Sequence, residues 1–173
     1  MKQVKTFALT GLITIGAFAM IAYSSCGKKD ACEDVVCKNN GTCVDGSCKC
    51  PTGYEGVDCG QTSAAKFTGL WAATDVCPIS TRTGTDLKYH VTISTSNADP
   101  MQVDVKGIGA TDYTFSATAN GKTLTIDEQT AADGRKYSGT ITYSNATTLS
   151  MSFSIKDSSG TPVEACTSTL KKS

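Results

Sequence analysis

Histidine is almost absent from this chain of 173 residues, in which His90 is the single one. Paired Cys-x-x-Cys motifs are missing as well, so the usual ligand patterns of structural zinc sites are lacking. No glycine-rich phosphate loop, nucleophile elbow or metal-binding helix motif occurs. These absences argue against a zinc module, a nucleotide-binding enzyme and a hydrolase with a catalytic triad.

An excess of charge of one sign is also lacking, because 16 Lys and Arg residues balance 16 Asp and Glu residues. Removal of residues 1–25 would take away Lys2 and Lys5 and leave 14 basic against 16 acidic residues. No basic patch with interleaved aromatic residues remains. We therefore expect no nucleic-acid partner.

The apolar stretch at residues 7–23 is short for a membrane-spanning helix. It follows Lys2 and Lys5, and this order of a charged and then an apolar segment is typical of a secretory signal peptide. We predict that residues 1–25 are a signal peptide that is cleaved on export.

Cysteine, in contrast, is abundant and odd in number, with nine residues. Six lie from Cys32 to Cys59, and Cys26, Cys77 and Cys166 lie outside that run. A cytosolic protein would be kept reduced, so this content predicts an oxidising compartment. If Cys26 serves another purpose, the other eight can all form disulfides. Metal binding by the six-cysteine run is the alternative.

Small residues precede the first cysteine, and Tyr23-Ser24-Ser25-Cys26 resembles the lipobox of bacterial lipoproteins. In that family the leader is removed before the cysteine, whose thiol and new amino group are then acylated. The resemblance implies lipidation at Cys26, a lipidated tether over residues 26–31, and a membrane as partner through the lipid anchor. It also implies the cell envelope, with the outer membrane expected and the periplasmic or surface-facing side left open. The alternatives are an ordinary signal peptide that leaves Cys26 free, and an uncleaved anchor.

The six-cysteine run has four, five, four, one and eight residues between successive cysteines. With Asn40-Gly41-Thr42-Cys43 and the closing sequence CKCPTGYEGVDC, it resembles an EGF-like domain of the short tenascin type, over residues 32–60. Six cysteines alone leave many pairings open. The resemblance implies the bonds Cys32–Cys43, Cys37–Cys48 and Cys50–Cys59. Such a small module depends on cross-links because it cannot bury an adequate core.

Some EGF-like domains bind calcium through acidic residues near the first cysteine. Asp30, Glu33 and Asp45 are weak candidates, but Ala31 stands where that motif has an acid or an amide. We expect these carboxylates to be solvated, and we assign no metal and no cofactor. In the closing sequence, Gly53 and Gly56 are expected to adopt positive φ in a tight turn.

Residues 61–66 are small and polar and indicate a linker, after which the composition changes. Apolar residues then alternate with Ser, Thr and Lys, which is the period of a strand with one buried face. Such runs, with a first strand through Trp71, predict about eight strands: 87–94, 101–105, 113–117, 124–126, 137–143, 149–155 and 163–170. We predict an all-β chain in which residues 67–173 form an antiparallel up-and-down β-barrel, with a two-sheet β-sandwich as the alternative.

Turn-forming residues lie between the expected strands. Asn120-Gly121 predicts a two-residue hairpin turn, because both residues can adopt positive φ. Asp133-Gly134 and residues 97–100 and 157–160 indicate further turns. Their positions favour strands that pair in sequence order.

Two features favour a closed barrel. Gly69-Leu70-Trp71 resembles the Gly-x-Trp of the first strand of lipocalin-like proteins, and the resemblance covers residues 67–173. Cys77 follows the first expected strand and Cys166 lies in the last. A Cys77–Cys166 bond would join the strands that meet on closure, and its long loop corresponds to about 4–5 kcal/mol of stabilisation.

Aromatic residues of the β domain either line a ligand pocket or fill the core, since barrels of eight strands do both. So many large inward groups in a domain of this size favour a filled core. The residues are Trp71, Tyr89, Tyr113, Phe115, Tyr137, Tyr143 and Phe153.

No catalytic set is evident in the β domain. His90 lies on the polar face of its strand, and we expect Asp127 and Glu128 to be solvated in a turn. We assign no catalytic residue and predict that the protein is not an enzyme. The expected function is binding or adhesion at the cell envelope, to a protein, a glycan or an apolar ligand, with the EGF-like module as spacer or interaction module. The alternative is a lipocalin-like carrier of a small apolar molecule.

Lipidation at Cys26 predicts that Cys26→Ser releases the protein from membranes, because the acylated thiol is lost. Cell fractionation and mass spectrometry of the native protein measure this, with Ser24→Ala as a control that keeps the cysteine. Retention of Cys26→Ser in washed membranes would contradict the prediction.

Overall fold

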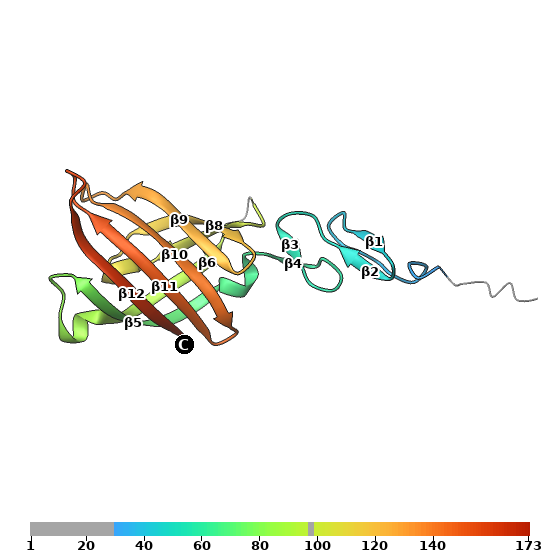
Figure 1. Cartoon of the computed structure of the whole chain (residues 1–173), viewed down its shortest axis with the longest axis horizontal. Helices are drawn as coiled ribbons and strands as arrows, with labels where there is room; N and C mark the ends of the chain where they lie inside the picture. The colour runs from blue at the N-terminus through green and yellow to red at the C-terminus, as the bar shows by residue number, and fades with distance from the viewer. Residues whose placement is uncertain (1–29, 97–98) are drawn as a thin grey trace, which may run out of the picture.

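The computed structural model describes residues 30–96 and 99–173. The predicted signal peptide, Cys26 and all but the end of the tether lie outside these residues. The chain is all-β, with a small disulfide-rich module followed by a closed antiparallel barrel of eight strands (Figure 1). The predicted fold class is confirmed, and the sandwich alternative is excluded. Within the described ranges, no helix is long and apolar enough to cross a membrane.

The small module is built from two short hairpins. Its strands are β1 (Thr42–Val44) paired with β2 (Ser47–Lys49), and β3 (Tyr54–Glu55) paired with β4 (Gln61–Thr62). The bonds Cys32–Cys43, Cys37–Cys48 and Cys50–Cys59 are all present. Gly53 and Gly56 have φ of 89° and 96°, as their turn requires.

The segment 61–66, predicted to be a linker, has regular structure. Its first two residues form β4, and Ala65–Phe67 forms the 3₁₀ turn η1. Phe67 is fully buried, and its carbonyl accepts a hydrogen bond of 2.9 Å from Trp71 Nε1. The small polar sequence concealed this because the partner of β4 lies in the closing loop of the module. The module and the barrel therefore follow each other with no unstructured spacer.

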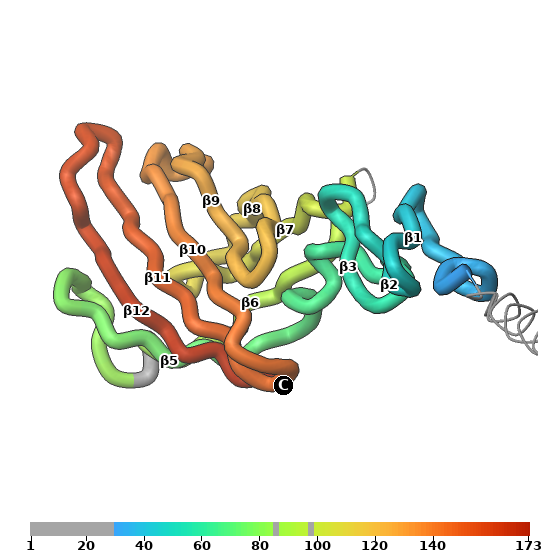
Figure 2. The backbone as a smooth tube through the Cα atoms, turned by 45° about the vertical axis from the view of Figure 1, so that its right-hand side comes forward, coloured from blue at the N-terminus to red at the C-terminus, as the bar shows by residue number. Residues whose placement is uncertain are grey.

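The barrel strands run antiparallel in sequence order, and the last closes on the first. They are β5 (Gly69–Ile79), β6 (Lys88–Thr95), β7 (Gln102–Lys106), β8 (Thr114–Asn120), β9 (Thr123–Thr130), β10 (Lys136–Asn145), β11 (Thr148–Lys156) and β12 (Pro162–Lys172). Figure 2 shows β5 beside β12, and the Cys77–Cys166 disulfide joins these two strands. Two 3₁₀ segments, η2 (Gly84–Leu87) and η3 (Ile108–Ala110), lie in the connections.

The β8–β9 turn is shifted by one residue from the predicted position. Asn120 pairs with Thr123, so the two turn residues are Gly121 and Lys122, and Gly121 has φ of 55°. The preceding pair, Ala119 with Leu124, is fully buried on both sides. A shift of register by one residue would expose both, so core packing outweighed the local preference of Asn-Gly.

Asp127 and Glu128 lie within β9, whereas a solvated turn was expected. Ile126 pairs with Gly139 and Gln129 pairs with Tyr137, so both acidic residues oppose the single residue between those partners. This β-bulge explains why two neighbours in a strand are both exposed.

The module contacts the end of the barrel that carries the β6–β7 and β8–β9 turns (Figure 1). Ala64 N donates to the carbonyl of Pro100 at 3.4 Å. Lys66 Nζ donates to Glu55 Oε2 of the module at 2.7 Å and to Gly121 O of the barrel at 2.8 Å. The Lys66 side chain is largely buried, so it holds the two parts together directly.

Gly139 of β10 lies close against β11, because a Cβ at this position would lie 2.6 Å from Ser152 O. We expect Gly139→Ala to lower the free energy of unfolding by about 1–3 kcal/mol, since the obstructing atom belongs to the backbone. Chemical denaturation measures the change, with Thr142→Ala, an exposed change in the same strand, as control. Equal stability of the two variants would show that β10 moves away without cost.

Candidate functional site

The interior of the barrel is filled by the aromatic residues that were considered as pocket lining. Trp71, Phe115, Tyr137 and Phe153 are at most 4% exposed. The rings of Phe115 and Tyr137 stack with centroids 4.7 Å apart. The remaining three aromatic residues are partly buried and pack against the same core: Tyr89, Tyr113 and Tyr143. These residues therefore serve as core.

A shallow depression of about 580 Å³ crosses the outer face of β9 to β12. A second depression, of about 330 Å³, adjoins it across β5 and β10 to β12. Short Ser and Thr side chains line both depressions. Because these side chains are small, the surface over these strands is hollowed. We call this area the hydroxyl face; its hydroxyl residues are Thr74, Ser138, Thr140, Thr142, Ser150, Ser152, Ser154, Thr167 and Thr169.

The bulge in β9 places two carboxylates at the margin of the hydroxyl face. Glu128 accepts a hydrogen bond of 2.8 Å from Lys156 Nζ and lies 3.6 Å from Lys136 Nζ. The hydrogen bond from Lys156 lowers the pKa of Glu128 below its ordinary value. Asp127 also lines the larger depression, so this margin of the hydroxyl face carries charged groups of both signs.

Exposed apolar side chains lie at the opposite margin, along β5. Val76 is 69% exposed and lines the smaller depression, and Ile79 is 47% exposed. The hydroxyl face is thus bordered by charged residues on one side and by apolar residues on the other.

A cluster of buried charged residues lies inside the barrel, near the end that faces away from the module. Asp75 of β5 has a side chain with no exposed surface, and Glu164 of β12 has one that is 10% exposed. Arg82, from the connection after β5, donates from Nη2 to Asp75 Oδ2 at 2.6 Å. Its Nε donates to both carboxylate oxygens of Glu164, at 3.0 and 3.1 Å. One guanidinium therefore serves two buried carboxylates.

Further polar groups complete the cluster around Asp75 Oδ1. Ser168 donates to this oxygen at 2.5 Å and the hydroxyl of Tyr89 donates at 3.1 Å. Burial, and next the charge of Asp75, raise the pKa of Tyr89, which stays protonated and able to donate. Burial opposes the charge of Arg82, but the hydrogen bonds that Arg82 donates to Glu164 and Asp75 outweigh this effect and raise the pKa of Arg82. The guanidinium of Arg82 therefore stays charged beside the two carboxylates.

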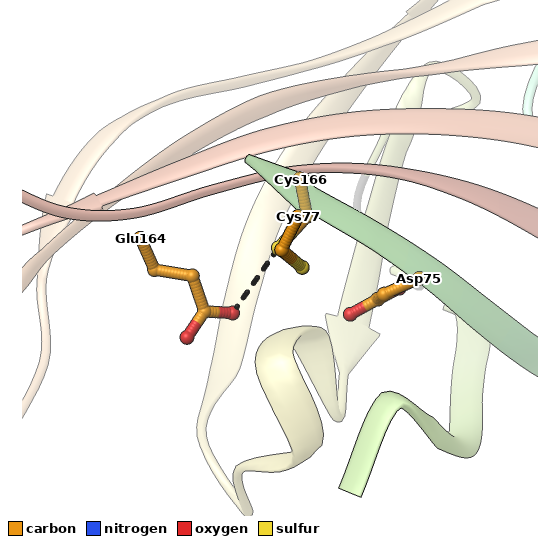
Figure 3. A group of neighbouring side chains, drawn as sticks. All are labelled: Asp75, Cys77, Glu164 and Cys166. Carbon is orange, nitrogen blue, oxygen red and sulfur yellow. Dashed lines mark hydrogen bonds between the residues drawn. A yellow bond between two sulfur atoms is a disulfide. The ribbon is translucent and has the colours of Figure 1, made fainter. Parts of the chain in front are cut away.

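The sequence contains a signal for this cluster. Asp75 and Glu164 each lie two residues before a cysteine of the Cys77–Cys166 bond. Alternate residues of a strand face the same side, so inward cysteines imply inward carboxylates. Figure 3 shows the two carboxylates on either side of the cysteine pair.

Other residues considered from the sequence are not gathered into a site. His90 is exposed, as are Asp30, Glu33 and Asp45. Asp30 Oδ1 instead accepts a hydrogen bond of 2.9 Å from the backbone of Cys32. In the part of the chain that the structure describes, the Cys, Asp and Glu ligand atoms that converge belong to β5 and β12.

These observations define the class of the molecule: a disulfide-built EGF-like module joined to a filled eight-strand barrel. A family model described as EGF-like domain matches residues 31–59. No curated protein matches the chain. A solved structure described as "Structure of EF1p2_mFAP2b bound to DFHBI" is 17% identical, over 64% of this chain and 97% of that chain, with a TM-score of 0.43. We infer nothing about the barrel from a likeness at this level.

The buried cluster predicts that Arg82→Ala lowers the free energy of unfolding by about 3–5 kcal/mol, because two buried carboxylates lose their counter-charge. Denaturant titration of the oxidised protein measures this. Arg135→Ala is the matched control, since its partner Asp133 lies 3.8 Å away at the surface and the loss should stay below about 1 kcal/mol. Similar losses in both variants would contradict the role of burial.

Proposed function

We propose that this protein is a lipid-anchored, non-enzymatic binding protein of the bacterial cell envelope, whose hydroxyl face meets a protein or a glycan. The observation that carries the proposal is the filled barrel, in which Trp71 and Tyr137 are at most 1% exposed. A partner is therefore met by the outer surface.

The position of the EGF-like module supports a role as spacer. The coloured chain begins, in blue, at the end of the module that points away from the barrel (Figure 1). An anchor at Cys26 would thus be separated from the barrel by the whole disulfide-bonded module. Three disulfides and the contacts of Lys66 keep this spacer compact and attached. A disulfide-rich module also supports export.

The chemistry of the hydroxyl face supports a polar partner. Ser and Thr hydroxyls both donate and accept hydrogen bonds, and glycans and peptide backbones offer matching groups. The apolar margin at Val76 and Ile79 adds area that a partner would bury. Such a mixture of polar and apolar surface is typical of a non-obligate interface.

The alternative function, a carrier for a small apolar molecule, gains no support from the interior. A carrier holds its ligand in a cavity within the barrel. The aromatic side chains expected to line that cavity contact one another, as the 4.7 Å stacking of Phe115 on Tyr137 illustrates.

Binding through the hydroxyl face predicts that Thr140→Arg with Ser152→Arg weakens capture of the partner by about tenfold or more, because two long side chains then fill the larger depression. The probes are arrays of immobilised glycans and of extracellular proteins, screened with the full chain. Thr92→Arg, on the outer face of β6, is the matched control. Binding that survives the double change, or no binding by the wild type, would overturn the proposal.

A further inference from the structure

Four potential metal-ligand atoms converge inside the barrel around one nitrogen atom, Nη2 of Arg82. They belong to Asp75, Cys77, Glu164 and Cys166, and all lie within 4.8 Å of one another. Nη2 of Arg82 contacts each of them: Asp75 Oδ2 at 2.6 Å, Cys166 Sγ at 3.7 Å, Cys77 Sγ at 3.9 Å, and Glu164 Oε1. A cationic nitrogen thus occupies the point where the four ligand atoms meet.

We propose that these four residues form a divalent metal site of the zinc or cadmium class, which becomes available when a dithiol reduces the Cys77–Cys166 disulfide. In the oxidised protein Arg82 Nη2 holds the cation position. In the reduced protein the metal ion replaces it.

The ligand set suits such an ion. Two thiolates and two carboxylates form a four-ligand set of the kind Zn²⁺ accepts, with Zn–S of about 2.3 Å and Zn–O of about 2.0–2.2 Å. A tetrahedron with these bonds places ligand atoms about 3.3–3.8 Å apart, against the present limit of 4.8 Å. The strands that carry the four residues are already paired, so the site needs only side-chain rotations, including those that separate the two sulfur atoms once their bond is reduced.

The charge balance favours a divalent ion. The oxidised cluster carries one net negative charge, from two carboxylates and one guanidinium. Reduction adds two electrons and two protons to the Cys77–Cys166 bond and leaves that charge unchanged. The reducing dithiol supplies them and becomes a disulfide itself. The metal ion then displaces both thiol protons to solvent, and its two positive charges balance the two thiolates. The buried region keeps its net charge throughout, which avoids the cost of burying new charge.

The four ligands and Arg82 differ in how they are attached. The ligands project from β5 and β12, which form the closing seam of the barrel. Arg82 lies in the connection between β5 and η2. This connection is at the end of the barrel away from the EGF-like module (Figure 2). The guanidinium can therefore leave the centre without a change in strand pairing, and it remains near enough to neutralise the site.

The test is cadmium binding by the full chain after reduction with dithiothreitol and removal of the reagent without oxygen. We expect a ¹¹³Cd resonance typical of two sulfur and two oxygen ligands, distinct from any all-sulfur sites formed by the EGF-like cysteines. Total cadmium should be one equivalent per chain higher in the wild type than in Cys77→Ser/Cys166→Ser. Absence of this resonance in the wild type, or equal cadmium content in the two proteins, would overturn the proposal.

Two further variants test the roles within the cluster. Asp75→Asn/Glu164→Gln keeps both cysteines and should weaken cadmium binding by about tenfold or more. Arg82→Ala removes the competing cation and should strengthen it by about tenfold. Far-ultraviolet circular dichroism verifies that each barrel remains folded, and the resonance in the wild type decides the outcome if a variant does not fold. Weaker binding by Arg82→Ala would contradict the assignment of Nη2 to the metal position.

Discussion

The closing seam between β5 and β12 is the constraint on which the rest of this molecule depends. It joins the first and last strands of the barrel, carries the disulfide, and removes the exposed edges that an open sheet would present. Opposite Cys166 the ladder contains a bulge of two residues, Cys77 and Pro78. A proline is tolerated inside a sheet at such a place because its missing N–H would not have been paired.

Closure also determines where polar groups lie. Alternation along the seam turns Asp75 and Glu164 inward with the cysteines, where burial would be costly without the guanidinium of Arg82. The same alternation turns the short hydroxyl residues of β10 to β12 outward. Because aromatic side chains fill the interior, the outer face carries the proposed binding function, and the interior cluster carries the proposed metal chemistry.

The two parts of the chain are joined more closely than a module on a flexible spacer would be. β4 extends the EGF-like module to Thr62, and Phe67 is already part of the hydrophobic core of the barrel. Between them, Lys66 links a carboxylate of the module to a backbone carbonyl of the β8–β9 turn. A surface on the barrel is therefore held at a defined distance from the start of the module, which is the property that a spacer needs.

The sequence by itself determined the elements that depend on local chemistry. Cysteine spacing and the closing glycines identified the EGF-like module, and the period of two from Phe67 onward predicted the barrel strands and their filled core. Tertiary structure decided what depends on residues distant in sequence. The register of Ala119 with Leu124 moved the Asn120-Gly121 turn by one residue, and the bulge opposite Ser138 exposed both Asp127 and Glu128. The cluster around Arg82 exists because closure brings Asp75 and Glu164, which are far apart in the chain, to one guanidinium.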